Sequence, residues 1–503
     1  MSYRTEHDFL GEKQVPMAAL YGVQTMRAVE NFPITGQRLP ASLIRAMALV
    51  KKAAALANAD TGNLDLRLAN AIDRAASEVI QGRWHEHFIV DPIQGGAGTS
   101  INMNTNEVIA NRALELMGEE RGNYAVLSPN THVNMAQSTN DAFPTAMHIA
   151  VLDELRRLLT TMLELEAAFA RKAREFDPII KMGRTHLQDA VPIRLGQEFE
   201  AYRRVLSRDV GRISAAGQHL TEVNMGATAV GTGLNADPEY IRRVVKYLAQ
   251  LSGHPITSAP DLIDATQNTD TYTAVSAALK VCMLNMSKVA NDLRLMASGP
   301  RAGLGELQLP ARQPGSSIMP GKVNPVMAEV VNQVAFQVAG NDLTIGLASE
   351  AGQFELNVME PVLIFNLLQS ISMMDSVFTV FRKYLLEDLK ANADVMREYV
   401  ERSVGVVTAI NPHVGYETAA RLAREATLTG RPIREVVLES GVLTGEQLDI
   451  ILNPYNMTSP GISGAELLKA RHLHHEHGHP EGGPEKQGEQ GEQGEHRASI
   501  RMT

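Results

Sequence analysis

The chain has 503 residues, 44% of them hydrophobic, and a formal net charge of −10. This length allows several domains with a large core, the acidic balance argues against a general nucleic-acid binder, and no apolar run approaches the roughly 18 residues of a membrane span. The N-terminal segment shows no apolar signal-peptide stretch, and the single cysteine, Cys282, excludes an internal disulfide and suits a reducing cytoplasm.

The first part of the chain combines several shorter helical patterns. Apolar residues recur at helical spacing over Ala41–Ala59 and Leu64–Gln81. We therefore expect residues 1–138 to form a mixed, mainly helical N-terminal domain.

Long helices are predicted within residues 139–393. The pattern Met147–Phe176 has no internal Gly or Pro, and it predicts an apolar stripe formed by Leu152, Leu155, Leu159, Met162 and Leu163. Four more long patterns follow, at Leu195–Val223, Thr273–Ala297, Val326–Ala348 and Pro361–Ala391. Five such helices predict a central bundle domain. Their broad apolar faces favour packing against other chains, although a bundle whose outer faces merely carry apolar residues would show the same pattern.

The end of the chain changes character twice. Residues 394–470 are expected to form a small C-terminal helical domain, in which "REVVLESGVLTGEQLDIIL" predicts two short helices joined by a Gly-containing turn. Residues 471–503 are rich in His, Glu, Gly and Gln and have few aliphatic side chains to bury, so this tail is predicted to be disordered. Its histidines could bind Ni²⁺ or Zn²⁺ loosely, but disorder without function is the favoured interpretation.

One polar segment, "GSSIMPGKVNP" at residues 315–325, interrupts apolar surroundings. Its glycine and lysine spacing does not match a phosphate-binding loop. The glycines permit hinge-like backbone angles, while Ser316 and Ser317 offer hydroxyl groups. Lys322 can neutralise a carboxylate and Asn324 can hydrogen-bond to one. The segment is therefore either a helix–helix connector or a mobile loop that binds an anion.

Three other segments are rich in neutral hydrogen-bond donors. They are "GGAGTSINMNTNE", "QSTNDAFPT" and "GRTHLQDAVP", and their candidate site residues are Thr99, Ser138, Thr139, Asn140, Thr185 and His186. Each segment alone could serve only helix capping and turns. Four such segments with one lysine and one histidine indicate a site for a small polar anion. No second ligand stands at convincing metal spacing from His186, so no metal site is predicted.

These segments resemble the active-site segments of the aspartase/fumarase superfamily, and "GSSIMPGKVNP" is similar to its signature loop. Within the superfamily, the likeness is greatest to the aspartate ammonia-lyase family, and it extends from about residue 4 to 470. It rests on "RTEHDFLGEKQVP", "YGVQTMRAVENF", "KKAAALAN", "VNMGATAVGTGLN" and "NVMEPV". Class II fumarases share the loop, but they usually show Gln after the GT of the first segment and a Ser-Ser pair in place of Ser138-Thr139.

The resemblance implies a mainly α fold with three domains. The central five-helix bundle would form the twenty-helix core of a homotetramer, with each active site shared between three subunits. It also implies a cytoplasmic enzyme that reversibly deaminates L-aspartate to fumarate and ammonia without a required cofactor. Activation by a divalent cation such as Mg²⁺ is known for some members, and no activator site can be identified in this sequence.

The resemblance also assigns roles to the candidate residues. Ser316 is expected to be the general base that removes a proton from Cβ and leaves an aci-carboxylate, or enediolate. Donors to that carboxylate would be Thr99, Ser138, Thr139 and Ser317. Lys322 and Asn324 would bind the other carboxylate with Thr185 nearby, and Asn140 and His186 would face the amino group. Glu329 would support His186 if the two pair.

Three alternatives remain open at this stage. The same site could add water to fumarate, as in a class II fumarase. A non-catalytic structural member of the superfamily is a second alternative, and the intact loop argues against it. A metal-storage protein based on the His/Glu tail is a third.

Overall fold

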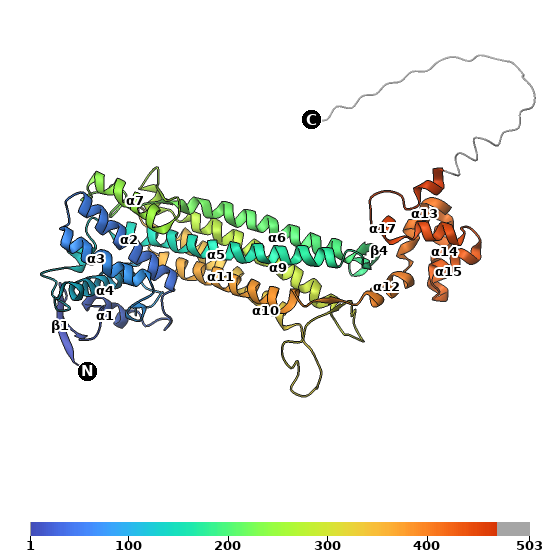
Figure 1. Ribbon diagram of the computed structural model, residues 1–503, viewed down its shortest axis with the longest axis horizontal. Helices are drawn as coiled ribbons and strands as arrows, with labels where there is room; N and C mark the ends of the chain where they lie inside the picture. The colour runs from blue at the N-terminus through green and yellow to red at the C-terminus, as the bar shows by residue number, and fades with distance from the viewer. Residues whose placement is uncertain (1, 470–503) are drawn as a thin grey trace, which may run out of the picture. The chain divides into compact units, whose positions relative to one another are not determined.

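The computed structural model describes residues 2–469 and is mainly helical, as predicted (Figure 1). Two compact units can be distinguished. The first comprises residues up to 179 together with 194–396, and the second comprises residues 180–193 and the chain from 397 onward. The expected boundary at residue 138 lies inside the first unit and stays a prediction, and the predicted tail 471–503 lies outside the described residues.

The N-terminal part of the first unit is a hairpin followed by helices. In the hairpin, β1 (Tyr3–Asp8) pairs antiparallel with β2 (Gly11–Pro16). The helices are α1 (Val23–Asn31), α2 (Ala41–Asp60), α3 (Leu66–Ile80) and α4 (Thr99–Met117). The two shorter helices predicted from sequence correspond to α2 and α3. Helix α3 begins where it does because the Asp65 carboxylate accepts hydrogen bonds from the backbone N–H groups of Arg67 and Leu68.

All five predicted long helices are present in the described chain. They are α5 (Thr139–Glu175), α6 (Leu195–Gln218), α9 (Asp270–Met296), α10 (Val326–Glu350) and α11 (Glu360–Phe381). Helix α11 ends before the predicted Ala391, because a π-helical turn at Arg382–Leu386 follows it and Lys390–Ala391 then form strand β8. Strand β8 pairs antiparallel with β7 (Leu307–Gln308).

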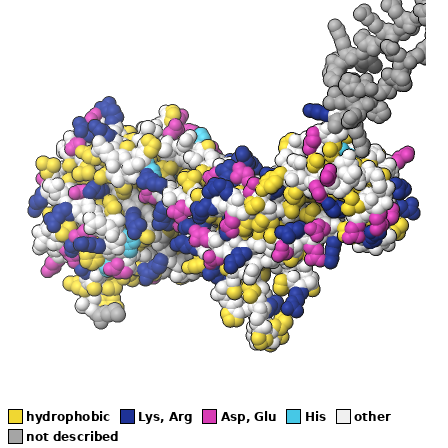
Figure 2. Space-filling model, turned by 45° about the vertical axis from the view of Figure 1, so that its right-hand side comes forward, with side chains coloured by type: hydrophobic (Ala, Val, Ile, Leu, Met, Phe, Trp, Pro, Cys, Tyr) yellow, Lys and Arg dark blue, Asp and Glu magenta, His cyan; other side chains and the backbone are white. Residues whose placement is uncertain are grey.

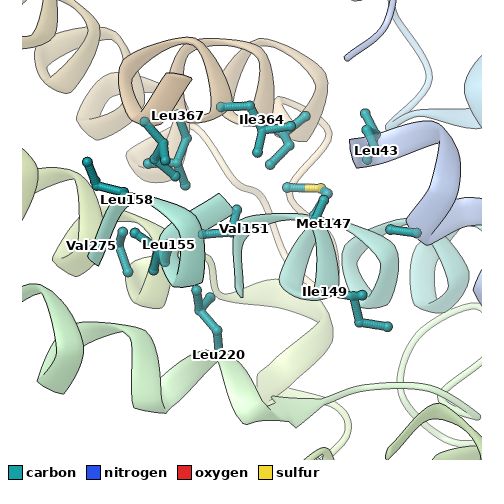
Figure 3. Close-up of a cluster of buried hydrophobic side chains, with 14 of the residues drawn as sticks. Leu43, Met147, Ile149, Val151, Leu155, Leu158, Leu220, Val275, Ile364 and Leu367 are labelled. Carbon is teal, nitrogen blue, oxygen red and sulfur yellow. The ribbon is translucent and has the colours of Figure 1, made fainter. Parts of the chain in front are cut away.

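The core of the bundle is built on one face of α5. Figure 3 shows Met147, Val151, Leu155 and Leu158 of this helix among buried side chains that include Leu43, Leu220, Val275, Ile364 and Leu367. The predicted stripe was wrong at Leu163, which is 53% exposed. The buried face follows positions 155, 158, 162 and 165, and position 163 is rotated about 100° from position 162.

One face of α10 remains uncovered within the chain. Phe336, Leu343 and Leu347 are 69%, 66% and 61% exposed, and their spacing places them on one side of the helix. Hydrophobic side chains also lie among charged groups on the surface of the bundle in Figure 2. Burial of this face against other chains stays a prediction.

Among the described residues, one helical segment is long and apolar enough to cross a membrane, Glu360–Leu386, which comprises α11 and the π-helical turn after it. Half of its apolar window is buried within the fold. The helix packs against α5 and α10, as the core helix of a bundle does.

The remaining described elements are short. The first unit also contains α7 (Pro238–Ser252), α8 (Asp264–Gln267) and β5 (Glu222–Val223), which runs parallel to β6 (Thr257–Ser258). The hairpin of β3 (Ile180–Thr185) and β4 (Gln188–Arg194) contributes nearly all its residues to the second unit. Helix α12 (Ala393–Arg402) begins in the first unit and ends in the second. The other helices of the second unit are α13 (Val407–Val414), α14 (Tyr416–Thr429), α15 (Ile433–Ser440), α16 (Gly445–Ile451) and α17 (Pro454–Met457). The predicted helix pair corresponds to α15 and α16.

Candidate active site

The starts of α4 and α5 bring four predicted site residues into one neighbourhood. Thr99 is the first residue of α4, and Ser138 caps α5 immediately before Thr139 and Asn140. The two helix starts are joined by a hydrogen bond of 3.1 Å from Asn102 Nδ2 to Thr139 Oγ1. Helix N-termini present unpaired backbone N–H groups, so this neighbourhood is suited to an anion.

A buried carboxylate, Asp141, fixes the start of α5. It accepts hydrogen bonds from the backbone N–H groups of Ser138 at 2.9 Å, Gly226 at 3.1 Å and Thr228 at 3.0 Å. Burial raises the pKa of Asp141 to about 6, against the effect of these donors and of the positive charge of Lys51. The carboxylate therefore ties the helix start to the loop around residues 226–228.

Asn140 also connects the start of α5 with this part of the chain. Its Nδ2 donates to the backbone oxygen of Ala229 at 2.7 Å, and its own backbone oxygen accepts from Asn224 Nδ2 at 2.9 Å. Thr99 is held as well, since its hydroxyl donates to the Gly96 carbonyl at 2.7 Å.

The loop of residues 315–325 is closed at its base by two hydrogen bonds. The Gly315 N–H donates to the Lys322 carbonyl at 2.9 Å, and Asn324 Nδ2 donates to the Gly315 carbonyl at 2.6 Å. A side chain at Gly315 would place its Cβ 2.2 Å from the Lys322 carbonyl oxygen. Only glycine permits this close approach, so the sequence pattern of the loop has a direct geometric cause.

Ser316 is the most distinctive residue of the loop. Its Oγ accepts hydrogen bonds from the backbone N–H groups of Ile318 at 3.2 Å and Met319 at 3.0 Å. Donors of this kind favour a negative charge on the accepting oxygen. Ser316 and Lys322 line one pocket of about 500 Å³. Ser317 is exposed next to it, and the loop protrudes from the first unit with hydrophobic and basic side chains at its surface (Figure 2).

Thr185 and His186 lie in the second unit, at the tip of the β3–β4 hairpin. His186 and Leu187 form the turn with φ of 55° and 60°. Two consecutive positive φ values are typical of a type I′ turn, which usually favours Asn or Gly. The strained turn exposes the His186 side chain. The guanidinium of Arg184 lies 5.7 Å from the Tyr399 ring centroid.

Within the first unit, the loop and the helix starts do not come together. Lys172, near the end of α5, lines the same surface pocket as Val323 of the loop. Thr139 lies 33 residues earlier in this unbroken helix, which corresponds to about 50 Å. Figure 1 shows the loop beside the start of α10 and far from α4. One chain therefore cannot place Ser316 against Thr139.

Glu329 lies in the first turn of α10, close to the loop in sequence. Its predicted pairing with His186 stays a prediction. Among residues 2–469, no group of three or more His, Cys, Asp or Glu side chains is placed to hold a metal ion.

Sequence reasoning missed Lys51, a fully buried lysine beneath the starts of α4 and α5. Its position in the apolar, alanine-rich sequence of α2 was the available signal. Cys282 is buried, and burial raises the pKa of its thiol well above the ordinary value.

Comparisons with known proteins show the family of the chain. Residues 11–340 match the Lyase family and residues 406–459 match the Fumarase C C-terminus family. The chain is 68% identical to the aspartate ammonia-lyase of Bacillus subtilis over 93% of this chain and 98% of that protein. It is 49% identical to the aspartate ammonia-lyase of Escherichia coli, over 91% of this chain and 96% of that protein.

Solved structures show the same fold. A fumarate lyase:delta crystallin from Brucella melitensis superposes with a TM-score of 0.89 at 46% identity, covering 91% of this chain and all of that chain. The class II fumarase of Schistosoma mansoni gives a TM-score of 0.87 at 35% identity, with the same coverage. The chain therefore belongs to the aspartase/fumarase superfamily of lyases, and within it to the aspartate ammonia-lyase family.

Proposed function

We propose that this enzyme reversibly converts L-aspartate into fumarate and ammonia. The observation that carries the proposal is the Ser316 oxygen, which receives two backbone N–H groups and lines the same pocket as Lys322. The names of the relatives at 49–69% identity support aspartate as the substrate.

The proposed reaction begins at Cβ of aspartate. Ser316, as an alkoxide, removes one proton from this carbon, and the electron pair moves into the adjacent carboxylate to form an enediolate. The N–H groups of Ile318 and Met319 stabilise the alkoxide by hydrogen bonding, which compensates for the low intrinsic acidity of serine. The enediolate then collapses, the Cα–N bond breaks, and ammonia leaves.

Neutral donors stabilise the extra negative charge. We assign Thr99, Ser138, Thr139 and Ser317 to the carboxylate that becomes the enediolate, and loss of one such donor typically costs about 10²–10³ in rate. Lys322 and Asn324 bind the other carboxylate, with Thr185 nearby. Asn140 and His186 face the amino group.

We infer that the active site is shared between three subunits of a homotetramer. A distance of about 50 Å along α5 separates the neighbourhood of the loop from Thr139 in one chain, so another copy must supply the loop. The exposed apolar face of α10 offers surface for the twenty-helix core of this assembly.

No cofactor is required in this reaction scheme, and activation by Mg²⁺ stays a prediction. We place the enzyme in the cytoplasm, because a single buried cysteine suits a reducing compartment.

The decisive assay follows the ultraviolet absorbance of fumarate with and without ammonium. An ammonia-lyase consumes fumarate only when ammonium is present, whereas a class II fumarase makes malate without it. Consumption of fumarate in the absence of ammonium would identify a class II fumarase. No consumption of fumarate with or without ammonium would support a non-catalytic structural protein.

The role of Ser316 is tested by Ser316→Ala. We expect turnover to fall by far more than in Ser317→Ala, which removes one donor and costs about 10²-fold. Folding should be unchanged, because Ser316 is only partly buried in a loop. Wild-type turnover in Ser316→Ala would contradict the assignment.

A further inference from the structure

Lys51 is a charged group in an unusual place. It lies in α2 with no exposed surface, and its Nζ donates to three side-chain carbonyl oxygens. The distances are 2.6 Å to Asn102 Oδ1, 3.0 Å to Asn134 Oδ1 and 2.8 Å to Gln137 Oε1. Burial of a lysine is costly unless its donors are satisfied, so a protein retains one only where the surroundings hold it.

The arrangement requires the charged form of the lysine. Three donated hydrogen bonds use three N–H hydrogens, and only the ammonium has them. Burial lowers the pKa of Lys51 to about 7, and the attraction of the Asp141 carboxylate limits this fall. The three amide oxygens all point toward the ammonium, so its positive charge fixes which way each amide faces.

A hydrogen-bond chain connects this ammonium with the candidate site. Asn102 accepts from Lys51 through Oδ1 and donates through Nδ2 to Thr139 Oγ1 at 3.1 Å. Because the Thr139 oxygen accepts this bond, its own hydrogen is directed elsewhere, and it meets no protein acceptor in the part of the chain that the structure describes. The Thr139 hydroxyl is therefore prepared to donate to a bound carboxylate.

Gln137 and Asn134 extend the same arrangement. Asn134 Nδ2 donates to the Gln137 backbone oxygen at 3.2 Å, and its Oδ1 also accepts from Asn102 Nδ2 at 3.2 Å. Gln137 directly precedes Ser138, the cap of α5. The lysine thus holds both the orientation of the Asn102 amide and the backbone that leads into the helix start.

We propose that Lys51 is a positioning residue, whose ammonium orients and polarises the Asn102 amide so that the Thr139 hydroxyl donates to the enediolate oxygens. This inference rests on the proposed ammonia-lyase reaction. Hydrogen bonds in a chain strengthen one another, and a cation at the head of the chain makes the last donor stronger. The effect should be largest for the enediolate, which carries more negative charge than the substrate carboxylate.

The test replaces the lysine by an uncharged side chain of similar shape, Lys51→Met, and uses Lys52→Met as the matched control. Lys52 is the next residue of α2, and its Nζ contacts Ser77 Oγ at 2.8 Å and Asp73 at 2.9 Å instead of the site. Both variants are measured as assembled enzyme, by calorimetric binding of two dicarboxylate-like ligands. Succinate represents the ground state, and the nitronate form of 3-nitropropionate imitates the geometry and charge of the enediolate.

We expect Lys51→Met to lower nitronate affinity about 10-fold while succinate affinity changes less than about 3-fold, because a weakened donor matters most for the more charged ligand. Lys52→Met should bind both ligands as the wild type does. A purely structural role would lower the number of binding sites or both affinities together. Equal losses for the two ligands, or no loss, would overturn the proposal.

A double-mutant cycle with Thr139→Val tests the route. If Lys51 acts through the Thr139 hydroxyl, the double variant binds nitronate no worse than Thr139→Val alone, within about 2-fold. The proposal would be overturned if the double variant lost nitronate affinity by the product of the losses in the two single variants. If Lys51→Met does not fold, Asn102→Asp replaces it, since this variant keeps an oxygen for Lys51 but removes the N–H donor to Thr139. A selective nitronate loss then supports the proposal, and an unchanged nitronate-to-succinate ratio overturns it.

These outcomes are separate from those of the proposed function. Wild-type enzyme that leaves aspartate unchanged would refute the ammonia-lyase reaction. If the wild-type enzyme is active but Lys51→Met and Lys52→Met bind both ligands with the same affinities, only the role of Lys51 is refuted.

Discussion

The glycine before α4 offers a sharp test of how the fold positions the site. Gly98 has φ of +89° and directly precedes Thr99. An ideal Cβ built there would lie 2.4–2.7 Å from three ring atoms of Phe143, a fully buried residue of α5. The change Gly98→Ala therefore introduces two costs, one in the backbone and one in packing between the two helices that carry the site.

The backbone cost and the packing cost of Gly98→Ala can each be given a free energy. A left-handed conformation costs an alanine about 1–2 kcal/mol, and overpacking a closed core costs about 1–3 kcal/mol. Gly98→Ala should therefore lower the free energy of unfolding by about 2–5 kcal/mol. The helices must move apart to relieve the contact, and a shift of about 1 Å at Thr99 can reduce turnover about 10²-fold.

Gly118→Ala is the matched control. Gly118 follows the last residue of α4 with φ of +82°, but no atom lies within 4 Å of its ideal Cβ. It should show only the backbone cost of about 1–2 kcal/mol and normal turnover. Urea unfolding at one fixed protein concentration and steady-state fumarate formation measure both variants. Equal stability of Gly98→Ala and Gly118→Ala would refute the reasoning. So would a loss of stability from Gly98→Ala that is no smaller when Phe143 is also replaced by Leu.

Four further outcomes are expected. Lys322→Ala should raise the KM for aspartate at least about 10-fold with little effect on stability, since the side chain is exposed in the loop; an unchanged KM would count against its carboxylate role. Burial lowers the pKa of His148 to about 4, below the ordinary 6.5, so the unfolded chain binds a proton first as the pH falls and about 3 kcal/mol of stability is lost between pH 6.5 and 4; His148→Leu should flatten that dependence in pH-resolved urea unfolding. Leu343→Asp should split the assembly and abolish activity with it, and light scattering that still shows the wild-type mass would refute the role of the α10 face. Cys282 should react with a thiol reagent only after unfolding, and rapid reaction of the folded enzyme would contradict its burial.

Regular, periodic features of the fold could be predicted from the sequence. The five long helices follow apolar residues at helical spacing, and four of their starts agree with the prediction within three residues, whereas the start of α5 was missed by eight residues. Helix α5 begins at Thr139 and not at Met147, because Ser138 and Asp141 form a capping box. The early end of α11 was not predictable in this way, since it depends on the pairing of Lys390–Ala391 with a strand about 80 residues earlier.

The site could be predicted only as separate groups of residues. Donor-rich segments reveal themselves locally, through glycines and adjacent hydroxyl or amide side chains. Lys51 did not, because its proposed role depends on Asn102, Asn134 and Gln137, which lie between 51 and 86 positions away in the chain. Spacing within a sequence carries no information about such contacts. The sequence likewise did not predict the distance between the loop and Thr139, because this distance depends on how α5 runs through the fold.

The placement of charge explains why such a site would use hydroxyl groups where arginines could bind a dicarboxylate more tightly. An arginine in contact with the reacting carboxylate would already bind the substrate strongly, and the part of its binding energy that substrate and enediolate share does not raise turnover. A hydroxyl backed by a buried ammonium behaves differently. Lys51 lies behind the Asn102 amide and makes no direct contact with Thr139, so in the proposed arrangement its charge strengthens the donor through the polarised chain that ends at Thr139. Such a donor gains most when negative charge grows on the accepting oxygens, and it releases the product once that charge is gone.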